Sequence, residues 1–144
     1  MFPEIKQKVE KIVLLGGAVG IGNISPSAEF NILIDPEAAK IVFDSGVEIV
    51  MVPIEVTHTA LVTPSVINRI KEFESPFGQL CVDLLNFFGE TYKRVFYFDY
   101  PPLHDPLAIA YVIDPSLFVT RHLRVDIVSK WLKVILTLYV GNTK

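Results

Sequence analysis

The chain has 144 residues, of which 51% are hydrophobic and 20% are charged, and its formal net charge is −3. This length favours a single domain over residues 1–144, and the acidic balance without a basic patch argues against a nucleic-acid partner. The sequence contains no run of 18 apolar residues and no apolar signal-peptide core at its N-terminus, so we expect neither a membrane partner nor a secretory leader.

The first predicted element is a buried strand over residues 11–15, KIVLL, which ends at Gly16-Gly17. A polar loop follows, then a helix over 36–44 and a second buried strand over 48–54. Both strands are continuous apolar runs, which is typical of a parallel sheet covered on both faces.

Three further helices are predicted downstream, over residues 64–73, 76–93 and 106–113. The fold class is therefore α/β, a mostly parallel sheet flanked by helices. We expect one face of the second of these helices to pack in the core, and the residues on that face are Phe77, Leu80, Cys81, Leu84 and Phe88.

Four predicted helix starts share one pattern, in which a short oxygen-bearing side chain precedes a proline. Such a side chain accepts hydrogen bonds from the first turn, and proline at the first helical position loses none. The pattern predicts caps at Asp35, Thr63, Ser75 and Asp105.

The glycine cluster over residues 16–23, GGAVGIGN, follows a strand and raises the possibility of phosphate binding. However, its spacing is not GxGxxG, Ser25-Pro26 follows where a helix should open, and no Walker lysine is present. A flexible connection from strand to loop is the better interpretation.

Two polar residues of the next segment, Glu29 and Asn31, point to the same side if that segment is extended. A carboxylate and an amide placed together can hold vicinal hydroxyl groups, and Asn23 can join them across the loop. On residue types alone, a polar surface loop with side-chain turns is the better interpretation.

A histidine at position 104 precedes the predicted helix start in an apolar context. Its ordinary pKa near 6.5 suits proton donation at neutral pH, although a lone histidine is more often structural. The single cysteine, Cys81, excludes an internal disulfide and suits a reducing compartment, so we expect a cytoplasmic protein.

Taken together, these segments resemble the inosine–uridine-preferring nucleoside hydrolases. The resemblance rests on the order and spacing of three stretches as far as about residue 126, and these stretches are KIVLLGGAVGIGNISPSAEFNILIDPEAAKIVF, MVPIEVTHTALVT and PPLHDPLAIAYVIDPSLF. It implies a partial nucleoside-hydrolase fold that cleaves the N-glycosidic bond of a ribonucleoside with water, giving ribose and a free base.

The resemblance also implies roles for individual residues. Asn23, Glu29 and Asn31 match ribose-binding positions, and Phe30 would lie near the substrate. His104 matches a histidine that protonates the departing base, and Asp105 matches a ligand of Ca²⁺.

The sequence departs from the family in two places. The aspartate-rich N-terminal motif of the family is absent, and with it most calcium ligands and the water-activating base. Residues 127–144 form a divergent tail. Two alternatives therefore stand beside the enzyme, a truncated non-catalytic fragment and an interaction module that pairs with another chain, and a homo-oligomer is one form of such pairing.

Overall fold

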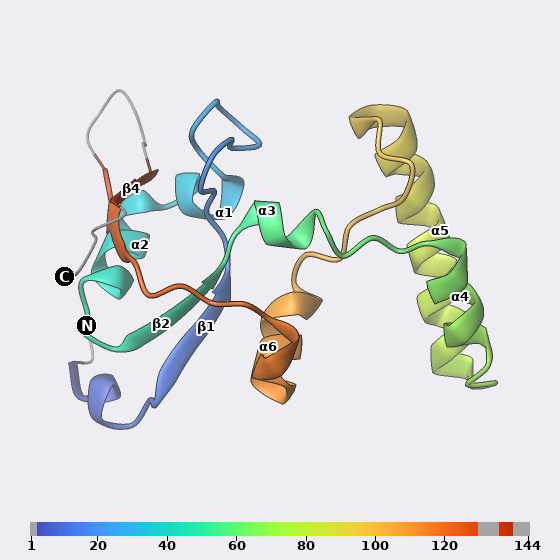
Figure 1. The fold of residues 1–144 in the computed structure, drawn as a ribbon, viewed down its shortest axis with the longest axis horizontal. Coiled ribbons are helices and arrows are strands. Elements are labelled where there is room, and N and C mark those ends of the chain that lie inside the picture. The colour runs from blue at the N-terminus through green and yellow to red at the C-terminus, as the bar shows by residue number, and fades with distance from the viewer. Residues whose placement is uncertain (1–2, 130–135, 140–144) are drawn as a thin grey trace. The chain divides into compact units, whose positions relative to one another are not determined.

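The computed structural model describes residues 3–129 and the backbone of residues 136–139. The chain forms two compact units, the first made of the described parts of Met1–Val56 and His104–Lys144 and the second of Thr57–Leu103. Each unit is described by itself below, and the assignment of one domain to residues 1–144 stays a prediction. Figure 1 shows the elements, which follow the chain in this order: η1 (Pro3–Gln7), β1 (Lys11–Leu15), α1 (Phe30–Leu33), α2 (Pro36–Phe43), β2 (Glu48–Val52), α3 (Ile54–Thr57), α4 (Pro64–Lys71), α5 (Pro76–Phe96), α6 (Pro106–Ile113), η2 (Pro115–Leu117), β3 (Arg124–Ile127) and β4 (Leu136–Tyr139).

The sheet of the first unit pairs β1 with β2 in parallel, in a register that runs from Lys11 opposite Glu48 to Leu15 opposite Val52. The connection between the strands contains α1 and α2, and α6 packs against β1. The parallel arrangement and the α/β class are therefore confirmed. Val52, at the end of β2, is buried, and it lies where both strands lead into the loops described below.

A second, antiparallel pair joins β3 to β4, with Arg124 opposite Tyr139 and Ile127 opposite Leu136. No sequence pattern predicted this pair. β3 ends at the first residue of the segment 127–144, which was predicted to be a divergent tail, and β4 lies inside that segment. Most of the segment lies outside the described residues.

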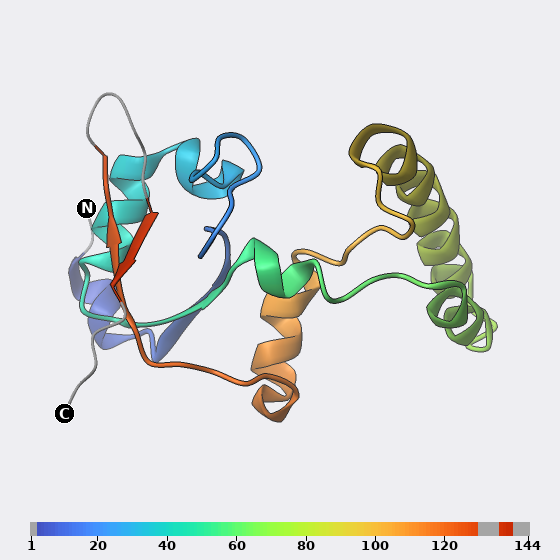
Figure 2. The same cartoon turned by 45° about the horizontal axis from the view of Figure 1, so that its top comes forward.

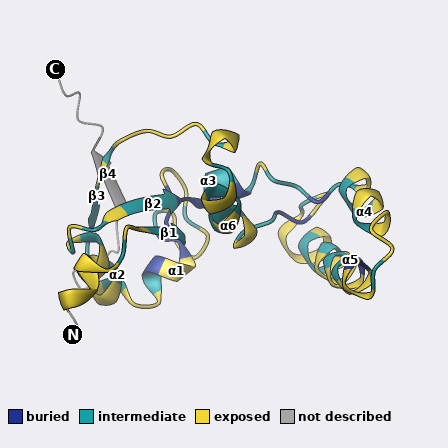
Figure 3. Cartoon of the chain, turned by 90° about the horizontal axis from the view of Figure 1, so that it is seen from below, coloured by how far each residue is buried: buried dark blue, intermediate teal, exposed yellow. Residues whose placement is uncertain are grey.

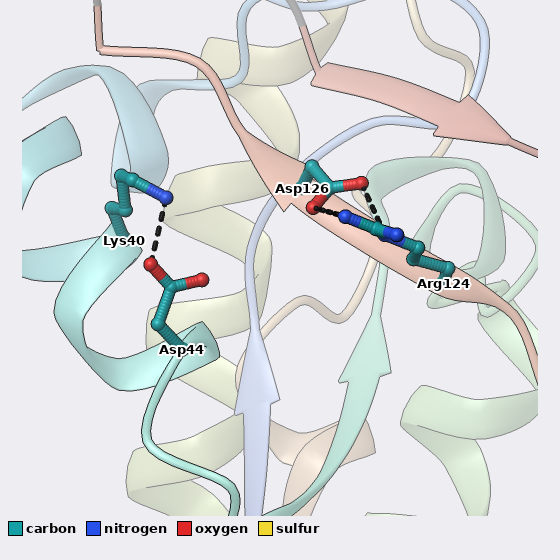
Figure 4. A network of polar contacts seen from close by, with 4 residues as sticks. All are labelled: Lys40, Asp44, Arg124 and Asp126. Carbon is teal, nitrogen blue, oxygen red and sulfur yellow. Dashed lines mark hydrogen bonds and ion pairs between the residues drawn. The ribbon is translucent and has the colours of Figure 1, made fainter.

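Helix α2 packs against β3 in the first unit, and each element carries its own ion pair (Figure 4). Lys40 bonds to Asp44 one helical turn away at 2.7 Å, and Arg124 binds both carboxylate oxygens of Asp126 at 2.8 and 3.0 Å. These pairs are exposed, so they contribute little to stability.

Two of the four predicted caps are confirmed. Asp35 accepts a hydrogen bond from the N–H of Ala38 at 2.9 Å, and Ser75 accepts one from the N–H of Gly78 at 2.9 Å. In the described structure Thr63 and Asp105 make no capping bond, so the prediction is wrong at both. The Asp105 backbone has already entered the helical region, with φ −56° and ψ −38°, and it lacks the extended conformation from which Ser75 reaches back.

The second unit consists mainly of α4 packed on α5. Within α5 the buried residues are Gly78 and Val82, while the Phe77 side chain is 74% exposed. The predicted apolar face is therefore mostly on the surface, and Figure 3 shows α5 as largely exposed or intermediate. The close approach between α4 and α5 is made at Gly78, where an added Cβ would lie 3.2 Å from the Ile70 oxygen. Cys81 is half-buried. None of the helices that the structure describes is long and apolar enough to cross a membrane.

Candidate functional site

The polar segment after β1 folds back on itself before it enters α1 (Figure 2). It continues the sheet for one residue, since the N–H of Gly16 donates to the carbonyl of Val52 at 3.2 Å. It then turns at Gly17, whose φ of 79° favours glycine.

Glu29 is the most buried residue of this segment that carries a charge, with 5% of its surface exposed. Its Oε2 accepts hydrogen bonds from the N–H of Gly17 at 2.8 Å and from the N–H of Asn31 at 3.0 Å. Glu29 is thus the N-cap of α1 and also ties this helix to the end of β1. Two backbone donors offset the cost of burying the carboxylate.

Asn23 and Asn31 lie on the exposed side of the same loop. The Oδ1 of Asn23 accepts a hydrogen bond from the N–H of Phe30 at 2.9 Å, which leaves its amide NH₂ as a donor. Asn31 is the second residue of α1, and its side-chain amide makes no hydrogen bond within the described residues. Phe30 is 49% exposed beside them.

The premise that residues 29–31 are extended is wrong, because α1 begins at Phe30. Glu29 and Asn31 nevertheless border the same point of the chain. A Cβ placed on Gly16 would lie 3.5 Å from the Asn31 Cβ and 3.6 Å from the Glu29 Oε2. The first turn of α1 thus places the Glu29 carboxylate and the Asn31 Cβ beside Gly16.

A tight inner turn closes the loop between these residues. The carbonyl of Ala28 accepts hydrogen bonds from three successive N–H groups, those of Asn23, Ile24 and Ser25, at 3.1 to 3.4 Å. Gly22 passes so close that an added Cβ would stand 2.2 Å from the Ala28 oxygen. Only glycine fits there.

A residue outside the loop also holds it. The Oε1 of Glu55, in α3, accepts hydrogen bonds from the N–H of Val19 at 2.9 Å and from the N–H of Gly20 at 2.7 Å. Burial raises the pKa of this carboxyl, but the N–H groups of Gly20 and Val19, with smaller contributions from those of Glu55 itself and Ile21, outweigh it and leave the pKa below 4.5. The carboxylate is therefore ionised at neutral pH.

These contacts bear on the possible phosphate site. The N–H groups of Gly17, Val19 and Gly20 already bond to the carboxylates of Glu29 and Glu55. A connection from strand to loop is the better description of the glycine cluster. Hydrogen bonds to Glu29 and to Glu55 hold this connection at two points, so it is less flexible than predicted.

His104 and Asp105 lie at the start of α6. The carbonyl of His104 accepts a hydrogen bond from the N–H of Leu107 at 3.1 Å, and its side chain is half-buried. Asp105 is exposed, and its carboxylate is not used as a cap. The structural explanation first given for this acid therefore fails.

The family model described as inosine-uridine preferring nucleoside hydrolase matches residues 1–137, nearly the whole chain. The chain belongs to this family. The match continues past residue 126, where the resemblance read from the sequence ended.

Several relatives of this nucleoside hydrolase family are similar to the chain. A probable ribonucleoside hydrolase of Dictyostelium discoideum is 52% identical over 133 residues, which cover 88% of this chain and 39% of the relative. The pyrimidine-specific ribonucleoside hydrolase RihA of Klebsiella pneumoniae is 44% identical over 119 residues, covering 82% of this chain and 38% of the relative. The chain thus spans about two fifths of the length of these relatives.

Two solved nucleoside hydrolases share the fold. The purine-preferring ribonucleoside hydrolase from Gardnerella vaginalis is 35% identical with a TM-score of 0.78, over 87% of this chain and 40% of that one. A plant nucleoside hydrolase is 32% identical with a TM-score of 0.86, over 97% of this chain and 45% of that one. The partial nucleoside-hydrolase fold is confirmed.

A calcium site needs six to eight oxygen ligands. Among residues 3–129, no three acidic, histidine or cysteine side chains come together in a way that holds a metal ion. Asp105 offers one free carboxylate, so the described residues do not fit a complete calcium site.

The sequence analysis did not identify Glu55 as part of the loop. It follows β2 by three positions, and no spacing links it to Val19, which lies 36 residues earlier. Nothing in the sequence pattern distinguishes it from an exposed acid at a helix start.

Proposed function

We propose that this protein takes part in hydrolysis of the N-glycosidic bond of ribonucleosides, with the loop from Gly16 to Asn31 holding the ribose. Membership of the nucleoside hydrolase family over residues 1–137 is the observation that carries this proposal. The proposal assigns ribose binding to Asn23, Glu29 and Asn31, with Phe30 beside the sugar.

The chemistry of the loop suits a sugar. The amide NH₂ groups of Asn23 and Asn31 are available as donors, and an amide oxygen or carboxylate accepts from hydroxyl groups. As the C–N bond breaks, positive charge develops on the ribose ring. The buried carboxylate of Glu29 stabilises that charge from close by.

His104 is proposed as the general acid that protonates the departing base. The electron pair of the C–N bond moves onto the base nitrogen, and a protonated imidazole supplies the proton that the nitrogen then needs. Water adds to the sugar carbon and loses a proton to solvent, and the imidazole regains a proton from solvent. General acid assistance of this kind contributes roughly 10²–10⁴-fold. Asp105 is proposed as one oxygen ligand of Ca²⁺, for which the described residues supply no complete site.

The test is release of free base from inosine or uridine by the 144-residue chain in excess Ca²⁺, measured by chromatography. We expect slow release, because the described residues do not complete a metal site, and slower release in His104→Ala and Asn31→Ala. An exposed substitution away from the loop, Glu72→Gln on the C-cap of α4, is the matched control. Undiminished release in both variants would contradict the assignment.

A second candidate function is an interaction module, and the exposed apolar side chains of α5 favour it. Phe77, Phe87 and Phe96 are 74%, 66% and 56% exposed. Large exposed apolar side chains can mark contact surfaces. Concentration-dependent association in light scattering, combined with nucleoside binding but no base release, would favour this module over an enzyme.

A further inference from the structure

Glu55 holds the outer part of the loop from Gly16 to Asn31, because its Oε1 accepts hydrogen bonds from the N–H groups of Val19 and Gly20. We propose that it is a positioning residue, which holds Val19 and Gly20 so that Asn23 stays fixed against α1 where ribose hydroxyl groups bind. This inference rests on the proposed function, since it names what positions the same loop.

Burial does not hold the outer part of this loop. The side chains of Val19, Ile21 and Ile24 are 53%, 76% and 57% exposed, so apolar packing contributes little to their position. The hydrogen bonds from Val19 and Gly20 to Glu55 span 36 and 35 positions of sequence and tie this part to α3. Together with the burial of Ala18 and the hydrogen bond from the Ile54 N–H to the Gly17 carbonyl, they fix where the outer loop lies.

The attachment leads directly to Asn23. Gly20 is three residues before Asn23, and between them Gly22 is wedged against the Ala28 backbone with no space for a Cβ. A shift of Gly20 therefore passes along the chain to Asn23. There the bond from the Phe30 N–H to Oδ1 sets the direction of the amide NH₂.

Glu55 holds Val19 and Gly20 most strongly because its side chain is a carboxylate. A charged acceptor bonds more strongly than a neutral one. The second oxygen, Oε2, is buried and has no partner among the described residues. The Glu55→Gln amide has two orientations. If its NH₂ takes the position of Oε2, this donor is buried without an acceptor. If its NH₂ takes the position of Oε1, it faces the N–H groups of Val19 and Gly20, which are donors themselves.

The experiment compares the wild-type chain with Glu55→Gln, Asn23→Ala and the double variant. Binding of D-ribose, inosine and free hypoxanthine is measured by calorimetry, and backbone hydrogen exchange at Val19 and Gly20 is measured by NMR. Glu10→Gln, an exposed acid just before β1, is the matched control.

We expect Glu55→Gln to weaken binding of ribose and inosine by roughly tenfold, the worth of one charged hydrogen bond. The loss should be much smaller in the Asn23→Ala background, because Glu55 acts through Asn23, and hypoxanthine binding should not change. A merely structural role would give additive losses and would weaken all ligands alike.

Exchange at Val19 and Gly20 should quicken in Glu55→Gln, while exchange in β1 stays as in the wild type. Additive losses, or unchanged exchange at both amides, would overturn the inference. If the wild-type chain bound neither ribose nor inosine, the proposed function would fail, and the exchange rates would still decide whether Glu55 holds the loop.

Discussion

At the scale of single residues, Glu29 shows how one acid serves two elements. Its Oε2 joins the N–H of Gly17, just past β1, to the N–H of Asn31, in α1, and the residue is 5% exposed. A loop that looked solvated in sequence thus has a buried carboxylate at its base. The amides of Asn23 and Asn31 stand outside it, which separates the charge from the donors.

Glu55 gives the first prediction, which concerns acid stability. Its pKa is lowered in the folded protein by the N–H groups of Gly20 and Val19, so its contribution to stability is present above the unfolded value and is lost as pH falls through the lowered folded value. We expect the stability difference between the wild type and Glu55→Gln, measured by urea denaturation, to shrink as pH falls from 7 toward 3. A difference that grows at low pH would contradict the lowered pKa.

Gly22 gives the second prediction. An alanine Cβ there would stand 2.2 Å from the Ala28 oxygen, which is far inside contact distance. We expect Gly22→Ala to destabilise the chain by about 1–3 kcal/mol in thermal or urea unfolding, as overpacked sites do. Gly20→Ala is the control, since its Cβ would meet the nearest atom, Glu55 Oε1, at an ordinary 3.6 Å. Equal losses in both variants would show that the close approach at Gly22 is not the cause.

The site residues were predictable from the sequence only in part. The motif marked Asn23, Glu29 and Asn31 as one group, but the extended conformation predicted for residues 29–31 was wrong. Helix α1 is four residues long, which is too short to show a helical period in the sequence. Glu55 was not predictable, because a hydrogen bond across 35 residues leaves no spacing to detect.

At the scale of elements, strong local signals predicted boundaries closely. The predicted bounds of β1 and α6 agree with the structure at every residue, and α2 differs by one. Each has a continuous apolar run or a proline start. The elements that were missed are short. α1, α3, β3 and β4 are each four residues long, and the 3-10 helices η1 and η2 are five and three residues long.

Caps give the third prediction, because Ser75 and Thr63 precede neighbouring helices of the same unit and differ in one bond. Ser75 accepts from the N–H of Gly78 and Thr63 makes no capping bond in the described structure. We expect Ser75→Ala to cost about 1 kcal/mol in urea unfolding, and Thr63→Ala to stay within about 0.5 kcal/mol. A larger loss at Thr63 than at Ser75 would contradict the assignment of these caps.

At the scale of the whole molecule, more of the large apolar side chains that the structure describes are exposed than buried. Mean hydropathy is +0.44, yet the buried apolar residues are few and mostly small, and large side chains of α5 are exposed. Such a composition requires either a large core or a contact surface. The sequence did not predict which, because the helical period shows an apolar face but not what covers it.

Calcium gives the fourth prediction. Asp105 is the one matched carboxylate ligand, and the described residues hold no cluster of metal-binding side chains. We expect calorimetry on the 144-residue chain to show weak Ca²⁺ binding that Asp105→Asn weakens further. Tight binding at one ion per chain, unaffected by this substitution, would show a calcium site built from other residues.

The N–H groups of the glycine loop that already donate hydrogen bonds affect which ligand charge the loop can accept. In an open loop, N–H groups such as those of Gly17, Val19 and Gly20 attract phosphate. Here they already hold the protein's own carboxylates, those of Glu29 and Glu55. A phosphorylated sugar would have to displace an internal anion while it approached two negative charges. If the loop holds ribose as proposed, we expect it to bind a nucleotide more weakly than the corresponding nucleoside because of electrostatic repulsion.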